Sequence, residues 1–107
     1  MSESKIQAEI IKHARNVLKV PKGCLFSIPN EGKRSGQFAS RLKAQGMVSG
    51  VPDLCLVWRG RVVFIEVKAP GGKLSTSQLN VIGNLKCEGA DVRLVKSLGD
   101  FLAIFEE

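Results

Sequence analysis

The sequence predicts an α/β fold in which helices flank a mixed β-sheet, with all 107 residues in a single domain. Three patterns favour this class: a long amphipathic helix near the start, two adjacent strands separated by two residues, and a final helix–strand–helix succession. Apolar residues make up 44% of the chain and charged residues 24%, which suits one globular core and excludes wholesale disorder.

The first half of the chain predicts two helices and a strand. Residues 4–19 repeat apolar side chains at the helical period, and Pro21 and Gly23 are expected to end that helix. Residues 24–28 are typical of a short strand. A polar loop follows, and residues 36–46 favour a short helix.

The second half predicts a hairpin, a helix, a strand and a final helix. Strand patterns cover residues 53–58 and 61–68, and Arg59-Gly60 between them suits a two-residue turn. Ser75 is expected to open a long helix that Gly89 closes. Residues 91–95 then form a strand and residues 98–105 an amphipathic helix, which gives the order α-β-β-β-α-β for the main elements.

Charge and cysteine content narrow the function classes. Lysine and arginine exceed the acids by six, and the whole excess lies in residues 1–50. Such asymmetry indicates a polyanionic partner, with plain solubility as an equal alternative. The three cysteines form no CxxC pair, which argues against a disulfide framework or zinc site and for the reducing cytosol. No apolar run approaches the roughly 18 residues of a membrane span.

The expected hairpin places two carboxylates opposite each other. With Arg59-Gly60 as the turn, Asp53 faces Glu66, and Lys68 follows on the same face of the sheet. Opposed like charges destabilise a sheet unless something compensates. Two carboxylates beside a backbone carbonyl suit a hard divalent cation, and the alternative is a surface ion pair with Lys68. The other face is aliphatic and predicts the core: Leu54, Leu56, Val63, Ile65 and Val67.

Three further side chains have two interpretations each. Glu9 lies beside the apolar stripe of the first helix, so it is a third site carboxylate or a solvated partner of a lysine. His13 is a ligand or, preferably, a half-buried helix residue. Gln78 completes the Ser75-x-x-Gln78 pattern of a capping box, and periodicity does not separate that role from a catalytic one.

These motifs resemble a known family. Gly50-Val51-Pro52-Asp53-Leu54, Ile65-Glu66-Val67-Lys68 and Leu74-Ser75-x-x-Gln78, with Glu9 in the first helix, are similar to the VRR-NUC domain. This domain belongs to the PD-(D/E)xK nuclease superfamily, and the likeness extends over about residues 5–95. The resemblance implies a restriction-endonuclease-like core that cleaves phosphodiester bonds with Mg²⁺ or Mn²⁺.

The resemblance also implies roles for individual residues. Asp53 and Glu66 would bind the metal with the Val67 carbonyl, and Glu9 would contribute directly or through water. Lys68 would orient or activate the attacking water, and Gln78 would position Lys68 or the substrate. Oxygen ligands agree with Mg²⁺ or Mn²⁺. Phosphate contacts are expected from basic residues outside this group, with a solvated surface as the alternative: Lys33, Arg34, Arg41, Lys43 and Lys73.

The expected substrate is branched DNA. Small members of the family resemble dimeric Holliday-junction resolvases of phages and bacteria, which predicts a homodimer in the cytoplasm of a bacterium or of a phage-infected cell. The last helix offers apolar side chains for a dimer contact or for packing on its own sheet: Leu98, Phe101, Leu102 and Phe105. The alternatives are a flap- or duplex-directed repair or restriction-type nuclease, and a non-catalytic DNA-binding module.

Overall fold

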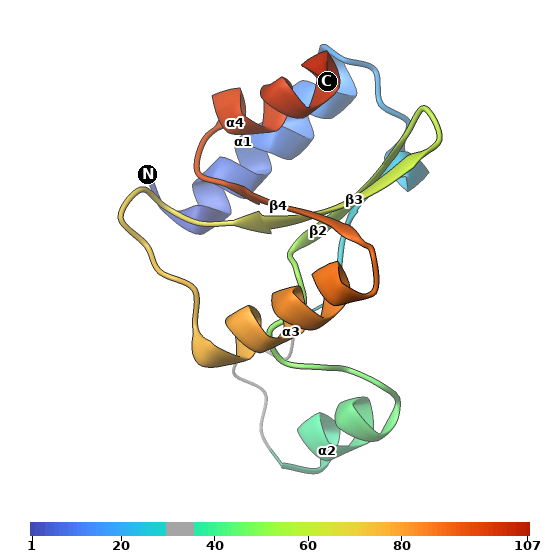
Figure 1. Cartoon of the computed structure of the whole chain (residues 1–107), viewed down its shortest axis with the longest axis vertical. Coiled ribbons are helices and arrows are strands. Elements are labelled where there is room, and N and C mark those ends of the chain that lie inside the picture. Colours follow the sequence, from blue (N-terminus) through green and yellow to red (C-terminus); the bar gives the residue numbers. More distant parts are fainter. Residues whose placement is uncertain (30–35) are drawn as a thin grey trace.

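Four strands form one mixed sheet with helices on both faces (Figure 1). The structure is a computed structural model, and it describes residues 1–29 and 36–107. The strands are β1 (Leu25–Ser27), β2 (Leu54–Trp58), β3 (Arg61–Val67) and β4 (Asp91–Val95), in that order across the sheet. The first two pairings are antiparallel and β3 with β4 is parallel, which confirms the predicted α/β class.

The helices form two layers around the sheet. Helices α1 (Glu3–Asn16) and α4 (Leu98–Ala103) cover one face, and α3 (Thr76–Cys87) lies on the other (Figure 1). Helix α2 (Gly36–Ala44) has no buried residue and projects from the body (Figure 1). Short 3₁₀ turns cover Lys22–Cys24 and Ile104–Glu106. In the described ranges, no helix has the length and apolar content to span a membrane.

The β2–β3 hairpin has the predicted register. Trp58 pairs with Arg61 and Val57 with Val62. Arg59 and Gly60 both adopt positive φ angles, 50° and 81°. Two successive positive φ angles define a type I′ turn, whose twist matches that of the flanking strands. The turn therefore fixes which side chains meet along the whole hairpin.

One sheet face packs against α1 and α4 and forms the core. Phe101 is fully buried, and Phe105 packs edge-on against Trp58 with ring centroids 5.3 Å apart. Phe101 thus packs on the sheet of its own chain, and Leu98, Leu102 and Phe105 are half-buried against the same core. The core contains the five aliphatic hairpin residues predicted from the sequence, together with side chains from α1, α4 and the 3₁₀ turn after it: Ile6, Ile10, Ala14, Phe101 and Ile104.

The first helix ends three residues before the predicted position. Lys19 adopts a φ of 59°, and the Val20 N–H donates to the carbonyl of Ala14 at 2.9 Å. A left-handed residue after the helix lets the chain reverse and satisfy a carbonyl of the last turn. The helix thus stops before Pro21 is reached.

Candidate active site

Asp53 and Glu66 lie side by side at the open end of the β2–β3 hairpin. They occupy the register position next to the Leu54–Ile65 pair. Asp53 Oδ2 accepts a hydrogen bond from the Val67 backbone N–H at 2.8 Å, which fixes the carboxylate against β3. Glu66 is only 1% exposed. The predicted opposition of two carboxylates is therefore present, and one of them is removed from water.

The environment of Glu66 disfavours a negative charge. Burial and, after it, the neighbouring Asp53 raise the pKa of Glu66 to about 8, although the positive charge of Lys68 acts in the opposite direction. Glu66 Oε1 is buried and has no hydrogen-bond partner among the described residues. Unpaired buried carboxylate oxygens are costly, so an additional cation at this position would satisfy a group that the chain leaves unsatisfied.

Lys68 contributes a cation held at the same edge. It is 8% exposed, and its aliphatic stem lies under the tight turn that begins at Ala69. In that turn the Gly72 N–H donates to the Ala69 carbonyl at 2.9 Å, and Gly71 has a φ of +83°. The Lys68 ammonium lies 3.9 Å from Glu3 Oε2. Lys68 therefore lies between the acid of α1 and the carboxylates of the hairpin.

Gln78 forms the predicted capping box and also contacts a site carboxylate. The side-chain Oε1 of Gln78 accepts a hydrogen bond from the Ser75 backbone N–H at 2.8 Å. The backbone N–H of Gln78 donates to Ser75 Oγ at 3.2 Å, which completes the capping box. The Nε2 of the same amide donates to Glu66 Oε2 at 3.2 Å. The start of α3 is thus coupled to the orientation of a site carboxylate.

Gly50 allows the loop before Asp53 to approach α3 closely. Its φ is +91°, and a Cβ built on it would lie 2.6 Å from both the backbone C and the O of Ser77. The Gln78 backbone N would be only 2.9 Å away. The Gly50–Asp53 loop and the first turn of α3 are therefore in backbone contact, which joins the positions of Asp53 and Gln78.

Glu9 does not lie with this group. It is exposed and faces a shallow hollow that Lys12, His13 and Leu98 also line. At about 100° per residue, Glu3 and Glu9 each lie about 60° from Ile6, on opposite sides of the apolar stripe. Periodicity therefore does not distinguish them, and the structure brings Glu3 to Lys68 instead. The one sequence signal for Glu3 is the N-cap Ser2, which places it in the first turn.

The expected phosphate-binding residues are spread over separate parts of the chain. Arg41 and Lys43 lie in the last turn of α2, and Lys73 is exposed in the loop before α3. Lys33 and Arg34 lie outside the described residues. The three described residues thus belong to two separate segments, α2 and the loop before α3.

The acidic pair provides the donor chemistry for a hard divalent cation. His13 is half-buried on α1, away from the pair, as the preferred interpretation expected. Across residues 1–29 and 36–107, no three His, Cys, Asp or Glu side chains come together as a metal site. Magnesium in proteins is commonly held by one or two carboxylates, with water and substrate phosphate as its remaining ligands. The Asp53–Glu66 pair, with its unsatisfied oxygen, fits that mode of binding.

Comparison with known proteins identifies the family and the fold. The family model of the VRR-NUC domain matches residues 2–98. A solved structure described as a VRR_NUC domain protein has a TM-score of 0.76 at 18% identity, over 99% of this chain and 86% of that one. A second, described as a VRR_NUC domain, has a TM-score of 0.65 at 24% identity, over 98% and 95%. No curated protein is a significant match.

Proposed function

Because the chain belongs to the VRR-NUC domain family and is therefore of nuclease type, we propose that it hydrolyses phosphodiester bonds in DNA with Mg²⁺ or Mn²⁺. The observation that carries this proposal is the buried Glu66, whose free oxygen lies beside Asp53 and near Lys68. In a purely structural ion pair each carboxylate oxygen would have a partner, whereas Glu66 Oε1 has none among the described residues.

Asp53 and Glu66 would hold the metal, with the Val67 carbonyl as a further oxygen donor. A bound divalent ion would lower the pKa of a water molecule and stabilise negative charge on phosphate. The Val67 N–H keeps Asp53 against β3, and the Gln78 amide orients Glu66. Both carboxylates are thus held before substrate arrives, which reduces the reorganisation that binding requires.

Lys68 would stabilise the negative charge that develops on the phosphate. Its burial strengthens that interaction because few water molecules compete. Glu3, 3.9 Å from the ammonium, would keep Lys68 at the site in the absence of substrate. A buried ammonium that faces the reacting group is worth more to the transition state than to ground-state binding.

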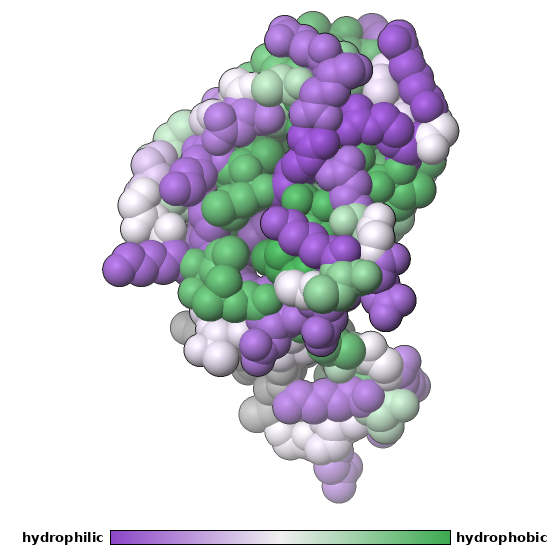
Figure 2. All heavy atoms as spheres, in the orientation of Figure 1, coloured by the Kyte–Doolittle hydropathy of each residue, from purple (hydrophilic) through white to green (hydrophobic). Residues whose placement is uncertain are grey.

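We propose branched DNA, in particular the four-way junction, as the substrate, and a two-fold homodimer as the active species. Paired cuts in a symmetric junction require two equivalent sites. Apolar side chains gather across the middle of the view in Figure 2, over the sheet and α3. On the α3 side of the molecule several are exposed and support a contact between copies: Val57, Val62, Leu79 and Leu94.

The substrate proposal is tested with end-labelled four-way junctions, flaps, nicked duplexes, intact duplexes and single strands, each incubated with Mg²⁺. Junctions should be cut fastest, in symmetric pairs, by a species of about twice the 11.6 kDa chain mass in light scattering. Faster cutting of flaps or duplexes would assign a different repair or restriction-type substrate. Binding to DNA without any cutting would indicate a non-catalytic module and overturn the proposal.

The cutting must also be shown to come from this chain. Asp53→Asn removes one of the opposed charges, so it should abolish cutting while DNA binding is retained or strengthened. Equal cleavage by the wild type and this variant would show that the activity does not depend on the Asp53–Glu66 site.

A further inference from the structure

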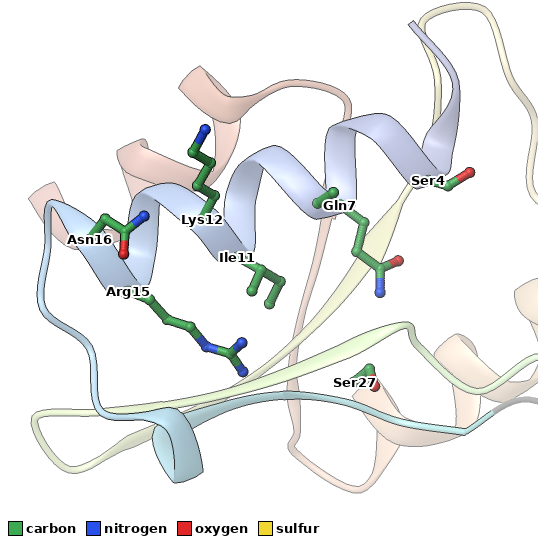
Figure 3. A pocket seen from close by; sticks show the side chains of 8 residues that line it. Ser4, Gln7, Ile11, Lys12, Arg15, Asn16 and Ser27 are labelled. Atoms are coloured by element: carbon green, nitrogen blue, oxygen red, sulfur yellow. The ribbon is translucent and has the colours of Figure 1, made fainter.

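A groove separates α1 from β1 on the side of the molecule shown in Figure 3. It has a volume of about 570 Å³ and is open to solvent. Gln7, Ile11 and Arg15 point from α1 toward the strand, and Ser27 lies opposite them on β1 (Figure 3). We call this feature the α1–β1 groove.

Both walls of the α1–β1 groove lead into the candidate active site. On the helix side, Ser4 lines the groove and directly follows Glu3, the residue that pairs with Lys68. On the strand side, Ser27 pairs with Leu54, the residue after Asp53. The next residue, Ile28, donates its N–H to the Asp53 carbonyl at 2.8 Å. One end of each wall of the groove therefore adjoins a residue of the site, Glu3 on the helix side and Asp53 on the strand side.

The lining of the α1–β1 groove suits a sugar–phosphate backbone. Arg15 and Lys12 supply positive charge, and no acidic residue lines the groove in the described part of the chain. Hydroxyl and amide groups of Ser4, Gln7 and Ser27 add hydrogen-bond donors. Guanidinium, hydroxyl and amide groups donate hydrogen bonds to phosphate oxygens, and these contacts do not depend on the base sequence. Ile11 adds an apolar surface that a sugar can cover.

The length of the α1–β1 groove sets how much of a strand it holds. Glu3 and Arg15 are twelve residues apart on one helix, which is about 18 Å at about 1.5 Å per residue. One strand of B-form DNA rises about 3.4 Å per nucleotide, so this span corresponds to roughly five nucleotides.

Building on the proposed function, we propose that the α1–β1 groove binds one DNA strand on one side of the scissile bond. Arg15 contacts a phosphate roughly five nucleotides from the cut. Lys12 points away from β1 in Figure 3 and adds only to the surrounding positive potential. The contact is to the backbone, so it applies to any base sequence.

The test compares Arg15→Gln with Lys86→Gln, because both positions are exposed on helices and both changes remove one positive charge. Lys86 lies in the last turn of α3, outside the α1–β1 groove. Each change is made in the Glu66→Gln background so that bound DNA is not cut. Affinity is measured by fluorescence anisotropy with labelled junctions whose arms are shortened, strand by strand, on either side of the cleavage position, at several salt concentrations.

The parent Glu66→Gln protein should lose affinity several-fold when the strand on one side becomes shorter than about five nucleotides. The Arg15→Gln variant should bind the full-length junction more weakly, and shortening that strand should not change its affinity. The salt dependence of its affinity should be smaller by about one phosphate contact. Lys86→Gln should match the parent. Gln7→Glu, which places a negative charge in the middle of the groove, should weaken binding further.

Two outcomes separate this inference from the function on which it rests. If the chain binds and cuts DNA but Arg15→Gln keeps the parent's salt slope and length dependence, the groove assignment is wrong and the nuclease proposal stands. If the wild-type chain neither binds nor cuts DNA, the proposed function fails and the groove assignment fails with it.

Discussion

Replacing Gly50 with alanine tests whether the loop before Asp53 is held in backbone contact with α3. Gly50 has a φ of +91°, and an added Cβ would lie 2.6 Å from the Ser77 backbone C and O. Left-handed backbone costs an alanine about 1–2 kcal/mol, and overpacking adds about 1–3 kcal/mol. Gly50→Ala should therefore lower the free energy of unfolding by about 2–5 kcal/mol.

Gly89 provides a matched control because its φ is also +91° and an added Cβ would meet no atom within 4 Å. Gly89→Ala carries the backbone strain alone, so it should cost about 1–2 kcal/mol. Urea unfolding followed by far-UV circular dichroism and by fluorescence of Trp58, the one tryptophan, measures both. Equal destabilisation by the two substitutions would refute the close approach.

The same contact predicts an effect on activity. Ser77 and Gln78 cannot withdraw from a Cβ at position 50 without moving the amide that donates to Glu66. Gly50→Ala should therefore reduce cleavage in addition to stability, while Gly89→Ala leaves cleavage unchanged in the folded protein.

Two further predictions concern the acids at the two ends of the chain. Glu3→Gln should lower the cleavage rate about 10–100-fold, as loss of a supporting partner typically does, and Glu9→Gln should leave it within about two-fold in the same assay. Hydrogen bonds from Arg93 lower the pKa of Glu107 from 4.5 to about 2. That stabilisation is present above the unfolded pKa and is lost as pH falls through the folded one. The melting temperature should therefore fall between about pH 4.5 and 2, and the melting temperature of the Glu107→Gln variant should fall less across that window. Equal falls for the two proteins would contradict this prediction.

Much of the site follows from the hairpin alone. A two-residue turn leaves one register, and alternation along each strand then puts Asp53 beside Glu66 and the aliphatic residues on the core face. The burial of Glu66 was not predictable, because it depends on how α3 and the Gly50 loop cover that end of the sheet. These are contacts between segments far apart in the sequence.

The α1 carboxylate shows where periodicity stops being informative. Glu3 and Glu9 flank the same apolar stripe symmetrically, so only the direction in which α1 crosses the sheet decides which of them meets Lys68. Gln78 is a different case, because the capping box and the hydrogen bond to Glu66 use different atoms of one amide. The cap therefore does not exclude a contact with the site, and the sequence pattern identified only the cap.

The most direct test of the central claim is the rate of DNA cleavage as a function of Mg²⁺ concentration, for the wild-type protein and Glu66→Gln under single-turnover conditions. Glu66→Gln keeps the size of the side chain and one oxygen that can accept from Gln78, but removes the charge that would hold the metal. We predict that the wild type requires Mg²⁺ and is inactive in EDTA, and that Glu66→Gln loses at least about 100-fold in rate at saturating Mg²⁺ while it still binds DNA. Cleavage that persists in EDTA, or a Glu66→Gln rate equal to that of the wild type, would contradict a metal-dependent centre built on Asp53 and Glu66.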